Sequence, residues 1–329
     1  MKKFKEMTYA EAINNATHQA MKLDNDVMIM GQLINYKPGI FGTTVKLAEK
    51  YGNERVRDFP VAENLMTFAG IGAAATGKRV ILVHIRIDFM MYAIDAIVNW
   101  LSLWRFKSNN ESNVPLVIRA IVGRGWGQGP QHSKSFHSWF SHLPGIKVAM
   151  PATAFDAKGL LLESIFSEDP SIIIEHRSLF NLKDWVPIQP YRVKYGEAII
   201  RKKGSDVTLV AIGCLVIDAL KAAKTLQKKG ISVEVIDPRT LSPLDSKTIL
   251  NSVSKTRRLI VADPGWQSFG AASEIISIVS EKFLKEMKSN PIKLSLPDSH
   301  TPMSKPLEKN YYLNQGDFIL AIEKSLKKK

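Results

Sequence analysis

Short apolar runs rich in Val and Ile alternate with longer segments of helical period along the whole chain, and this alternation most constrains the fold. The short runs are too brief for helices and are bounded by turn residues, as is typical of buried strands. The longer segments repeat apolar residues every three to four positions, as amphipathic helices do. Strands that alternate with helices favour parallel sheets with right-handed crossovers. The sequence therefore predicts an α/β fold.

The alternation predicts a set of elements in each half of the chain. In the first half, the expected strands are residues 27–31, 79–87, 116–122, 147–150 and 171–175, and the expected helices are residues 9–22, 43–51, 67–76, 90–105 and 156–166. In the second half, the expected strands are residues 207–212, 233–237 and 258–263, and the expected helices are residues 215–229, 245–253, 271–287 and 315–328. Each half can therefore build a mainly parallel sheet flanked by helices.

The length of 329 residues is typical of two domains. The segment with the least clear period, KDWVPIQPYRVKY, spans residues 183–195 and contains two prolines, so we expect the linker there. The first domain is then expected to comprise residues 1–186, and the second to comprise residues 187–329.

The composition is that of a globular protein with a basic surface. Hydrophobic residues make up 45% of the chain, the formal net charge is +14, and 24 basic against 14 acidic residues lie from Tyr191 onward. Such a surface can bind nucleic acid, can bind another acidic partner, or is only solvated. Because the chain has no zinc-finger spacing, no RNA-recognition signature and no repeat, we expect no nucleic-acid partner.

The chain carries no signature of secretion or of membrane insertion. The basic start is followed by no apolar core of a signal peptide. The most apolar long stretch, residues 89–104, contains Asp95 and Asn99 and is too short and too polar to span a bilayer. The single cysteine, Cys214, cannot form an internal disulfide, as is usual in a reducing compartment. We therefore expect a cytoplasmic protein without a membrane partner.

The most distinctive local motif is the glycine-rich loop GRGWGQGPQHS, which follows the expected strand 116–122. The loop lacks the lysine of a phosphate-binding Walker loop and the spacing of a dinucleotide fingerprint. His132, His137 and His142 match no metal-ligand spacing, so we expect no metal site on this chain. In open α/β folds such a loop lies at the carboxyl edge of the sheet, where ligands bind.

Three residues are candidates for chemistry, and each also has a structural interpretation. Glu63 precedes the expected helix 67–76, where an acid also stabilises the helix N-terminus through the helix dipole. Phe89 closes the run VHIRIDF, whose alternation places every second residue from Val83 on one strand face, where core packing is the ordinary role. His132 follows four glycines that let the backbone approach a ligand, but histidines in such loops are also structural.

Several segments together resemble a known family. They are EKYGNERVRDFPVAEN, GIGAAATGKRVI, YAIDAIVN, GQGPQHSKSFHSWFSHLPGIKVAMPATAFDAKGLL and VIDPRTLSPLD. Over residues 8–326 the chain is similar to the beta subunits of thiamine-diphosphate-dependent 2-oxoacid dehydrogenases of the pyruvate and branched-chain type. The resemblance implies a transketolase-type pyrimidine-binding domain followed by a transketolase-type C-terminal domain.

The resemblance assigns roles to residues by position. Glu63 matches the glutamate that hydrogen-bonds to the aminopyrimidine of thiamine diphosphate and favours the tautomer that takes the proton from the thiazolium carbon. Phe89 matches the aromatic residue that packs on the pyrimidine ring, and Ile85 lines the same pocket. Tyr92 stands where the family has a glutamine that faces the cofactor. His132 matches the histidine of the QHS motif, which handles the substrate or the acyl acceptor, so Glu63 and His132 are the expected catalytic residues.

The resemblance also implies a partner chain. In this family an alpha subunit holds the diphosphate and Mg²⁺ through a GDG…N motif, which this sequence lacks, since Gly316 and Asp317 are followed by Phe318. We therefore expect half of a shared site, an α2β2 heterotetramer with contacts between beta chains, and activity only with the alpha partner. The small residues of segment 68–76 fit a close helix contact at such an interface.

Some residues depart from the family pattern. Arg86 and Asp88 replace small or neutral residues beside Phe89, and Arg124 lies in the loop before His132. Arg86 and Asp88 are either a solvated or interfacial salt pair, or part of a reshaped substrate site. In the second interpretation Arg86 or Arg124 binds a carboxylate or phosphate in bidentate fashion.

The departures leave three functions open. The family default is decarboxylation of a 2-oxoacid and transfer of the acyl unit to a lipoyl acceptor. The second is a free-standing, split transketolase-like carboligase that passes the unit to an aldehyde or sugar. The third, from another class, is a non-catalytic interaction subunit, which the presence of Glu63, Phe89 and His132 disfavours.

Docking onto an acyltransferase core also stays open. In relatives the C-terminal domain presents acidic groups to a basic subunit-binding domain, whereas here that domain is basic and His300 stands about where an aspartate is usual. Because like charges weaken and slow association, we expect weak or no binding to such a basic domain.

Overall fold

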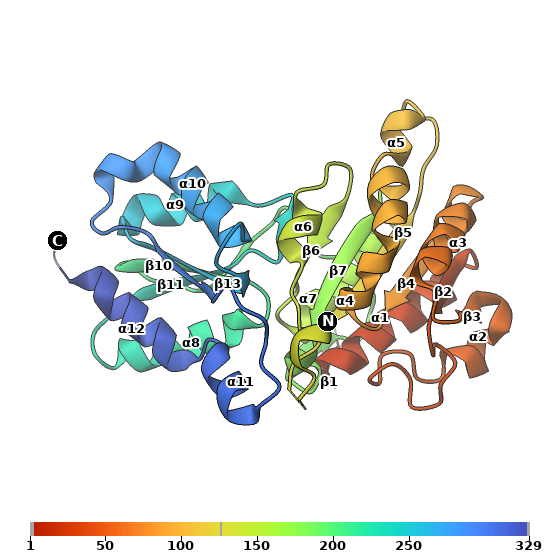
Figure 1. The fold of residues 1–329 in the computed structure, drawn as a ribbon, viewed down its shortest axis with the longest axis horizontal. Coiled ribbons are helices and arrows are strands. Elements are labelled where there is room, and N and C mark those ends of the chain that lie inside the picture. The colour runs from red at the N-terminus through yellow and green to blue at the C-terminus, as the bar shows by residue number, and fades with distance from the viewer. Residues whose placement is uncertain (1–2, 126, 328–329) are drawn as a thin grey trace. The chain divides into compact units, whose positions relative to one another are not determined.

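The structure, a computed structural model, describes residues 3–125 and 127–327 (Figure 1). The chain forms two compact units. The first contains the residues up to Arg124 together with Trp139–Tyr195. The second contains Gly125–Ser138 together with the residues from Gly196 onward. In each unit helices flank a mainly parallel sheet, so the predicted fold class is confirmed.

A parallel sheet forms the centre of the first unit. Its strands follow the order β6-β7-β5-β4-β2-β3, and all neighbours are parallel. Their bounds are β2 (Val27–Gly31), β3 (Val56–Asp58), β4 (Arg79–His84), β5 (Leu116–Val122), β6 (Lys147–Ala149) and β7 (Ser171–His176). Every residue of β2, β5 and β7 is buried, as expected for strands rich in Val and Ile that are covered on both faces.

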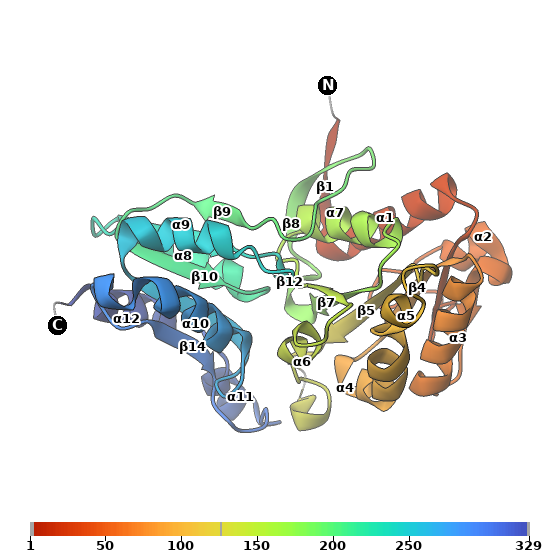
Figure 2. The ribbon, with the colours of Figure 1, turned by 90° about the horizontal axis from the view of Figure 1, so that it is seen from above.

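Helices cover both faces of this sheet. Figure 2 shows α1 and α7 on one face and α3, α4 and α5 on the other. The helices are α1 (Tyr9–Leu23), α2 (Leu47–Arg55), α3 (Glu63–Ala75), α4 (Ile87–Met90), α5 (Trp104–Lys107), α6 (His137–Ser141) and α7 (Ala154–Ile165). A capping box starts α1, because the Thr8 hydroxyl accepts from the N–H of Glu11 at 3.2 Å and the Glu11 carboxylate accepts from the N–H of Thr8 at 2.7 Å.

The predicted strand 79–87 is wrong at its end. β4 stops at His84, and the chain turns at Arg86, whose carbonyl accepts from the N–H groups of Phe89 and Met90. Phe89 therefore lies in α4 and not on a strand face. The alternation of VHIRIDF misleads because the tertiary structure also buries Arg86 among the apolar residues.

The single helix predicted for residues 90–105 is also wrong. A 3₁₀ turn (Met91–Ala93), a π-helical segment (Ala96–Leu101) and α5 replace it. Such changes of helical pitch rotate successive side chains away from one continuous face, and they occur often near functional sites.

Two strands of the first unit have no apolar signature in the sequence. β1 (Phe4–Thr8) pairs antiparallel with β8 (Lys183–Pro187). The predicted linker 183–195 is therefore wrong over its first five residues. The polar segments FKEMT and KDWVP form strands because they hydrogen-bond to each other, although they lie far apart in the sequence. Neither segment alone has a pattern that predicts a strand.

The second unit is built on a sheet with the order β14-β13-β10-β11-β9, in which β9 alone is antiparallel to its neighbour among the described strands. The strands are β9 (Ile199–Lys202), β10 (Val207–Ala211), β11 (Val233–Asp237), β13 (Leu259–Trp266) and β14 (Ile292–Leu296), and β12 (Thr240–Ser242) is a further short strand. In Figure 1, α8 and α12 lie on one face of the sheet, and α9 and α10 lie on the other.

The helices of the second unit match the prediction closely. They are α8 (Leu215–Gln227), α9 (Ser246–Thr256), α10 (Ala271–Phe283), α11 (Lys305–Tyr311) and α12 (Gln315–Leu326). The four predicted helices are confirmed, although the end predicted for the last, residue 328, lies outside the described residues. β9, β14 and α11 were not predicted, because they are short or partly exposed.

A buried ion pair joins two central strands of the first unit. Arg119 on β5 donates through Nε and Nη2 to Glu175 on β7, at 2.5 and 2.9 Å. Both side chains are essentially inaccessible to solvent. The register places Arg119 opposite Ile173, so Glu175 is its diagonal neighbour on the same face. Each charge is therefore tolerated only because the other is present.

We predict that Arg119→Met destabilises the chain by about 3–5 kcal/mol, because Glu175 is left as an unpaired buried charge. The double change Arg119→Met with Glu175→Leu should recover most of that loss, as measured by urea unfolding. Arg57→Met, which removes the exposed pair with Glu54, serves as the control and should cost at most about 1 kcal/mol. A double variant no more stable than Arg119→Met would contradict the prediction.

Candidate functional site

The candidate residues of the first unit gather at the carboxyl edge of its sheet. Glu63 follows β3, and Arg86 follows β4. Arg124 follows β5, and Arg177 follows β7. Since these strands are parallel, their carboxyl ends meet at one edge, which is the ordinary ligand-binding edge of an open α/β sheet.

Glu63 is the first residue of α3, where the helix dipole stabilises a carboxylate. The residue before it, Ala62, provides no side-chain cap. Glu63 is only 8% exposed, yet its carboxyl group forms no hydrogen bond or ion pair with any described residue. A buried carboxyl without a protein partner can hydrogen-bond to a ligand that enters the site.

A buried hydrogen-bond chain fixes the backbone that carries Glu63. The Thr67 hydroxyl donates to the Glu63 carbonyl at 2.7 Å, and His84 Nε2 lies 3.2 Å from the same hydroxyl oxygen. Because the hydroxyl has one proton and gives it to the carbonyl, His84 must donate from Nε2. The end of β4 thereby braces the first turn of α3. His84 was not predicted as a site residue, because no motif surrounds it in the sequence.

Two histidines at strand ends are held neutral by burial. Burial lowers the pKa of His84 from 6.5 to about 3. Burial, with a smaller contribution from the positive charge of Arg124, lowers the pKa of His176 to about 3 as well. His84 is the last residue of β4, and His176 is the last residue of β7. Both therefore lie at the same edge of the sheet.

We predict that the chain loses stability as the pH falls from about 6.5 towards about 3. The pKa of folded His84 lies below the ordinary histidine value of 6.5, so the unfolded chain takes up a proton that the folded chain excludes. Each such group steepens the loss by up to about 1.4 kcal/mol per pH unit. His84→Asn should flatten the pH profile of urea unfolding, whereas His142→Asn, at an exposed histidine, should not. Equal slopes for His84→Asn and the wild type would refute this assignment.

The segment after β4 brings three of the predicted residues together. The N–H of Phe89 donates to the carbonyl of Arg86 at 3.2 Å, and Arg86 Nη1 donates to the carbonyl of Ile85 at 2.9 Å. Ile85 and Phe89 are half-buried, whereas Tyr92 is 72% exposed. α3 and α4 are in contact, so this segment lies beside the helix that begins at Glu63.

Arg177 and Phe41 were not predicted as site residues. Arg177 directly follows a buried strand, as Arg86 and Arg124 follow strands or their ends, so a search for basic residues after apolar runs would have found it. Phe41 has no such signal, because it lies in an irregular loop after β2 with a left-handed φ of 49°.

His132 lies in the segment Gly125–Ser138, which groups with the second unit. Its Nδ1 donates to the carbonyl of Gln128 at 3.4 Å. At one end of the segment, the N–H of Gly125 donates to the carboxylate of Glu308 at 2.9 Å. At the other end, the Ser138 hydroxyl accepts from the N–H of Ala271 at 3.0 Å. The second unit thus holds the loop that carries His132.

A buried pair strengthens this attachment. His137 Nε2 lies 2.8 Å from Asp263 Oδ1, and both side chains are inaccessible to solvent. Burial by itself raises the pKa of Asp263, but His137 and the N–H groups of Ala272 and Gly265 outweigh it, so the pKa lies below its usual range. The charged carboxylate is therefore stabilised where it anchors the loop.

The chain matches two families of known domains. Residues 5–183 match the transketolase pyrimidine binding domain, and residues 196–317 match the transketolase C-terminal domain. The 2-oxoisovalerate dehydrogenase subunit beta of Bacillus subtilis (strain 168) is 36% identical over 321 residues, which cover 97% of this chain and 98% of that protein. The chain belongs to the 2-oxoacid dehydrogenase beta-subunit family.

Other relatives have a similar sequence identity to this chain. The acetoin:2,6-dichlorophenolindophenol oxidoreductase subunit beta of Cupriavidus necator is 37% identical, covering 96% of both chains. The pyruvate dehydrogenase E1 component subunit beta of Acholeplasma laidlawii is 36% identical, covering 98% of both. The solved structure of a split gene transketolase, an inactive beta4 tetramer, has a TM-score of 0.80 and 22% identity, covering 97% of this chain and 98% of that one. At 22% identity this structure shows the fold alone. The matching domain families and the curated relatives confirm the predicted family.

No helix in the described part of the chain is long and apolar enough to cross a membrane. Residues 3–125 and 127–327 hold no group of three or more His, Cys, Asp and Glu side chains suited to a metal ion.

Proposed function

We propose that the chain is the beta subunit of a thiamine-diphosphate-dependent enzyme that decarboxylates a 2-oxoacid and transfers the acyl unit to a lipoyl acceptor. The observation that carries the proposal is the carboxyl group of the largely buried Glu63, which has no hydrogen-bond partner among the described residues and lies at the sheet edge of the domain that matches a pyrimidine-binding family. We propose residues 1–186 as that domain and residues 187–329 as the C-terminal domain. A cytoplasmic location completes the proposal.

The residues of the first unit fit the pyrimidine end of thiamine diphosphate. Glu63 offers a carboxyl with no protein partner, and Phe89 offers a half-buried phenyl ring in the neighbouring turn. Ile85 adds apolar surface, and Tyr92 is exposed beside them. These four residues would hold the aminopyrimidine. When bound, the cofactor supplies an electron sink for loss of carbon dioxide.

Glu63, Phe89 and His132 each have a defined role in this proposal. Glu63 hydrogen-bonds to the pyrimidine ring and keeps a proton available there, with its backbone fixed by Thr67 and His84. Phe89 packs on the ring and excludes water. His132, whose Nδ1 is directed to a backbone carbonyl, acts on the substrate or the acyl acceptor.

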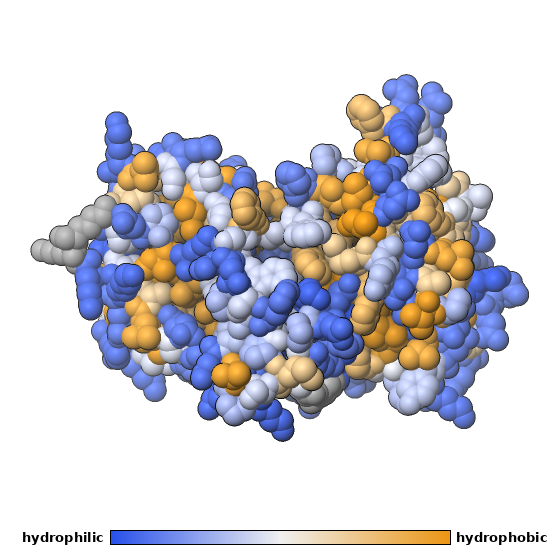
Figure 3. All heavy atoms as spheres, in the orientation of Figure 1, coloured by the Kyte–Doolittle hydropathy of each residue, from blue (hydrophilic) through white to orange (hydrophobic). Residues whose placement is uncertain are grey.

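Exposed apolar surface supports an alpha partner. In Figure 3, hydrophobic residues gather over the part of the first unit that contains α3 and α5. Large exposed apolar or aromatic side chains on α3, on α5 and on the segment between β4 and α5 are Leu65, Tyr92, Trp100 and Phe106. A Cβ at Gly72 of α3 would meet no atom within 4 Å, so a second helix can approach there closely. We propose that the alpha chain covers this region, that it holds the diphosphate and Mg²⁺, and that two such pairs form an α2β2 heterotetramer.

We predict that Glu63→Gln lowers turnover of the reconstituted alpha–beta enzyme by at least about a hundredfold, because the amide cannot exchange the proton. Thiamine diphosphate should still bind, as measured by titration calorimetry. Glu274→Gln is the matched control, because Glu274 is an exposed acid in the first turn of α10. Turnover near the wild-type rate in Glu63→Gln would overturn the proposed mechanism.

We predict that the second unit binds a basic subunit-binding domain weakly or not at all. Residues 191–329 carry 24 basic and 14 acidic side chains, so the electrostatic term opposes a basic partner. Calorimetry of the alpha–beta complex with such a domain at physiological salt measures the affinity. A nanomolar dissociation constant would contradict the prediction.

A further inference from the structure

Two guanidinium groups of the first unit approach one phenyl ring. The guanidinium carbon of Arg86 lies 5.0 Å from the centroid of the Phe41 ring, and that of Arg177 lies 4.4 Å from it. Arg177 also lies 5.2 Å from the ring centroid of Phe180. Phe41 follows β2, Arg86 follows β4 and Arg177 follows β7, so the cluster lies at the carboxyl edge of the sheet.

Arg86 is buried without full hydrogen bonding. The residue is 8% exposed, its Nη1 donates to the carbonyl of Ile85, and its Nε has no partner among the described residues. Arginine presents its N–H groups as a planar fork that matches a carboxylate or phosphate. A buried fork with an open donor is costly unless a ligand supplies the acceptor.

The charge of the cluster is positive. Burial lowers the pKa of Arg86, Asp88 opposes that effect, and the positive charge of Arg177 lowers the pKa further. Burial also lowers the pKa of Arg177. Asp88 favours the charged form of Arg86, and an anion bound beside the two guanidinium groups would stabilise their charged forms further.

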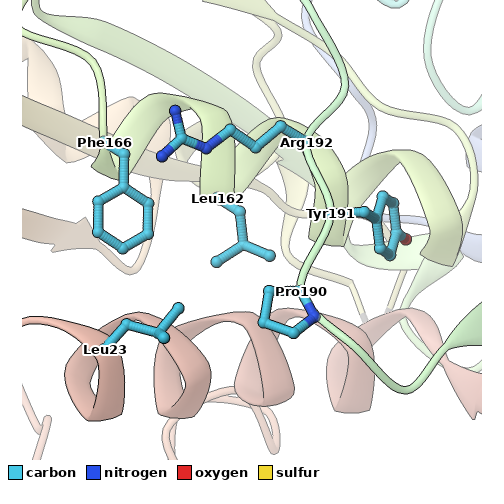
Figure 4. A pocket seen from close by; sticks show the side chains of 6 residues that line it. All are labelled: Leu23, Leu162, Phe166, Pro190, Tyr191 and Arg192. Carbon is cyan, nitrogen blue, oxygen red and sulfur yellow. The ribbon is translucent and has the colours of Figure 1, made fainter.

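The pocket in Figure 4 is lined by residues other than those of this cluster, and its one arginine is paired with an acidic residue. Its volume is about 270 Å³, and it lies between α1 and α7, with Leu23, Leu162, Phe166, Pro190, Tyr191 and Arg192 around it. Arg192 is half exposed, lies 4.9 Å from the ring centroid of Phe166 and is 4.0 Å from the carboxylate of Glu163. This partnered arginine on an aromatic ring is the matched control for Arg86.

We propose that Arg86 and Arg177 form an anion subsite that binds a terminal carboxylate or phosphate of the substrate, in bidentate fashion through Arg86. The assignment rests on the proposed function, and it adds the substrate class. The donor 2-oxoacid or the acceptor carries a second anionic group beyond the reacting carbons. Phe41 contacts both cations and provides a flat apolar wall for the chain of that molecule.

Binding to the full chain tests the subsite directly. Titration calorimetry with inorganic phosphate and with glutarate should give affinities that fall at least tenfold in Arg86→Gln and in Arg177→Gln. Arg192→Gln should bind as the wild type does. Arg86→Lys, which keeps the charge but loses the fork, should give an intermediate affinity and guards against a folding defect in Arg86→Gln. Absence of binding to the wild type, or equal affinities for the wild type and Arg86→Gln, would overturn the proposal.

Turnover of the reconstituted alpha–beta enzyme distinguishes the two sources of the anion. A donor role predicts that 2-oxoglutarate is preferred over its uncharged amide, and an acceptor role predicts that a phosphorylated aldehyde is preferred over the free aldehyde. In either case Arg86→Gln should abolish the preference by raising KM. If Arg86-dependent anion binding persists but no 2-oxoacid is turned over, the proposed function falls and the subsite stands. If turnover occurs and Arg86→Gln keeps the preference, the subsite falls.

Discussion

The parallel register of the first unit's sheet is the constraint on which its candidate site depends. Because β3, β4, β5 and β7 all run in one direction, the residues that follow them reach one edge. Glu63, Arg86, Arg124 and Arg177 are thus brought to that edge from segments far apart in the sequence. The buried pair of Arg119 and Glu175 works at the centre of the same sheet, where it is compatible with only one register of β5 against β7.

Burial gives these side chains their chemistry. A carboxylate in water is satisfied by solvent, but Glu63 at a helix start has lost most of its solvent and has gained no protein partner. The Thr67 and His84 chain fixes the backbone below it while leaving the carboxyl group itself unpaired. The backbone of Glu63 is therefore held by hydrogen bonds, whereas its carboxyl group has no hydrogen-bond partner among the described residues. A preorganised binding site requires this arrangement.

Periodicity predicted the elements whose stability comes from their own apolar residues. The strand 233–237 agrees with β11 at both ends, whereas α3 begins at Glu63, four residues before the predicted start at residue 67. The prediction failed where another part of the chain decides the structure. β1 and β8 are polar strands that exist through their mutual pairing, and the turn at Arg86 interrupts a run with perfect alternation. Arg177 was overlooked for a related reason: its relation to Phe41 and Arg86 exists only after three loops have been brought together.

The net charge of the chain and the charges of its site carry different information. Most of the surplus of fourteen positive charges lies on the second half, where exposed lysines remain solvated and influence long-range association more than recognition. Arg86 contributes one charge to that total, but it has been taken out of water and holds an open donor. The interaction of an ion with such a group is screened far less than at the surface. In the proposed anion subsite, substrate selection would therefore depend on a few desolvated cations at the sheet edge, whereas the larger basic surface would affect which proteins the chain can bind.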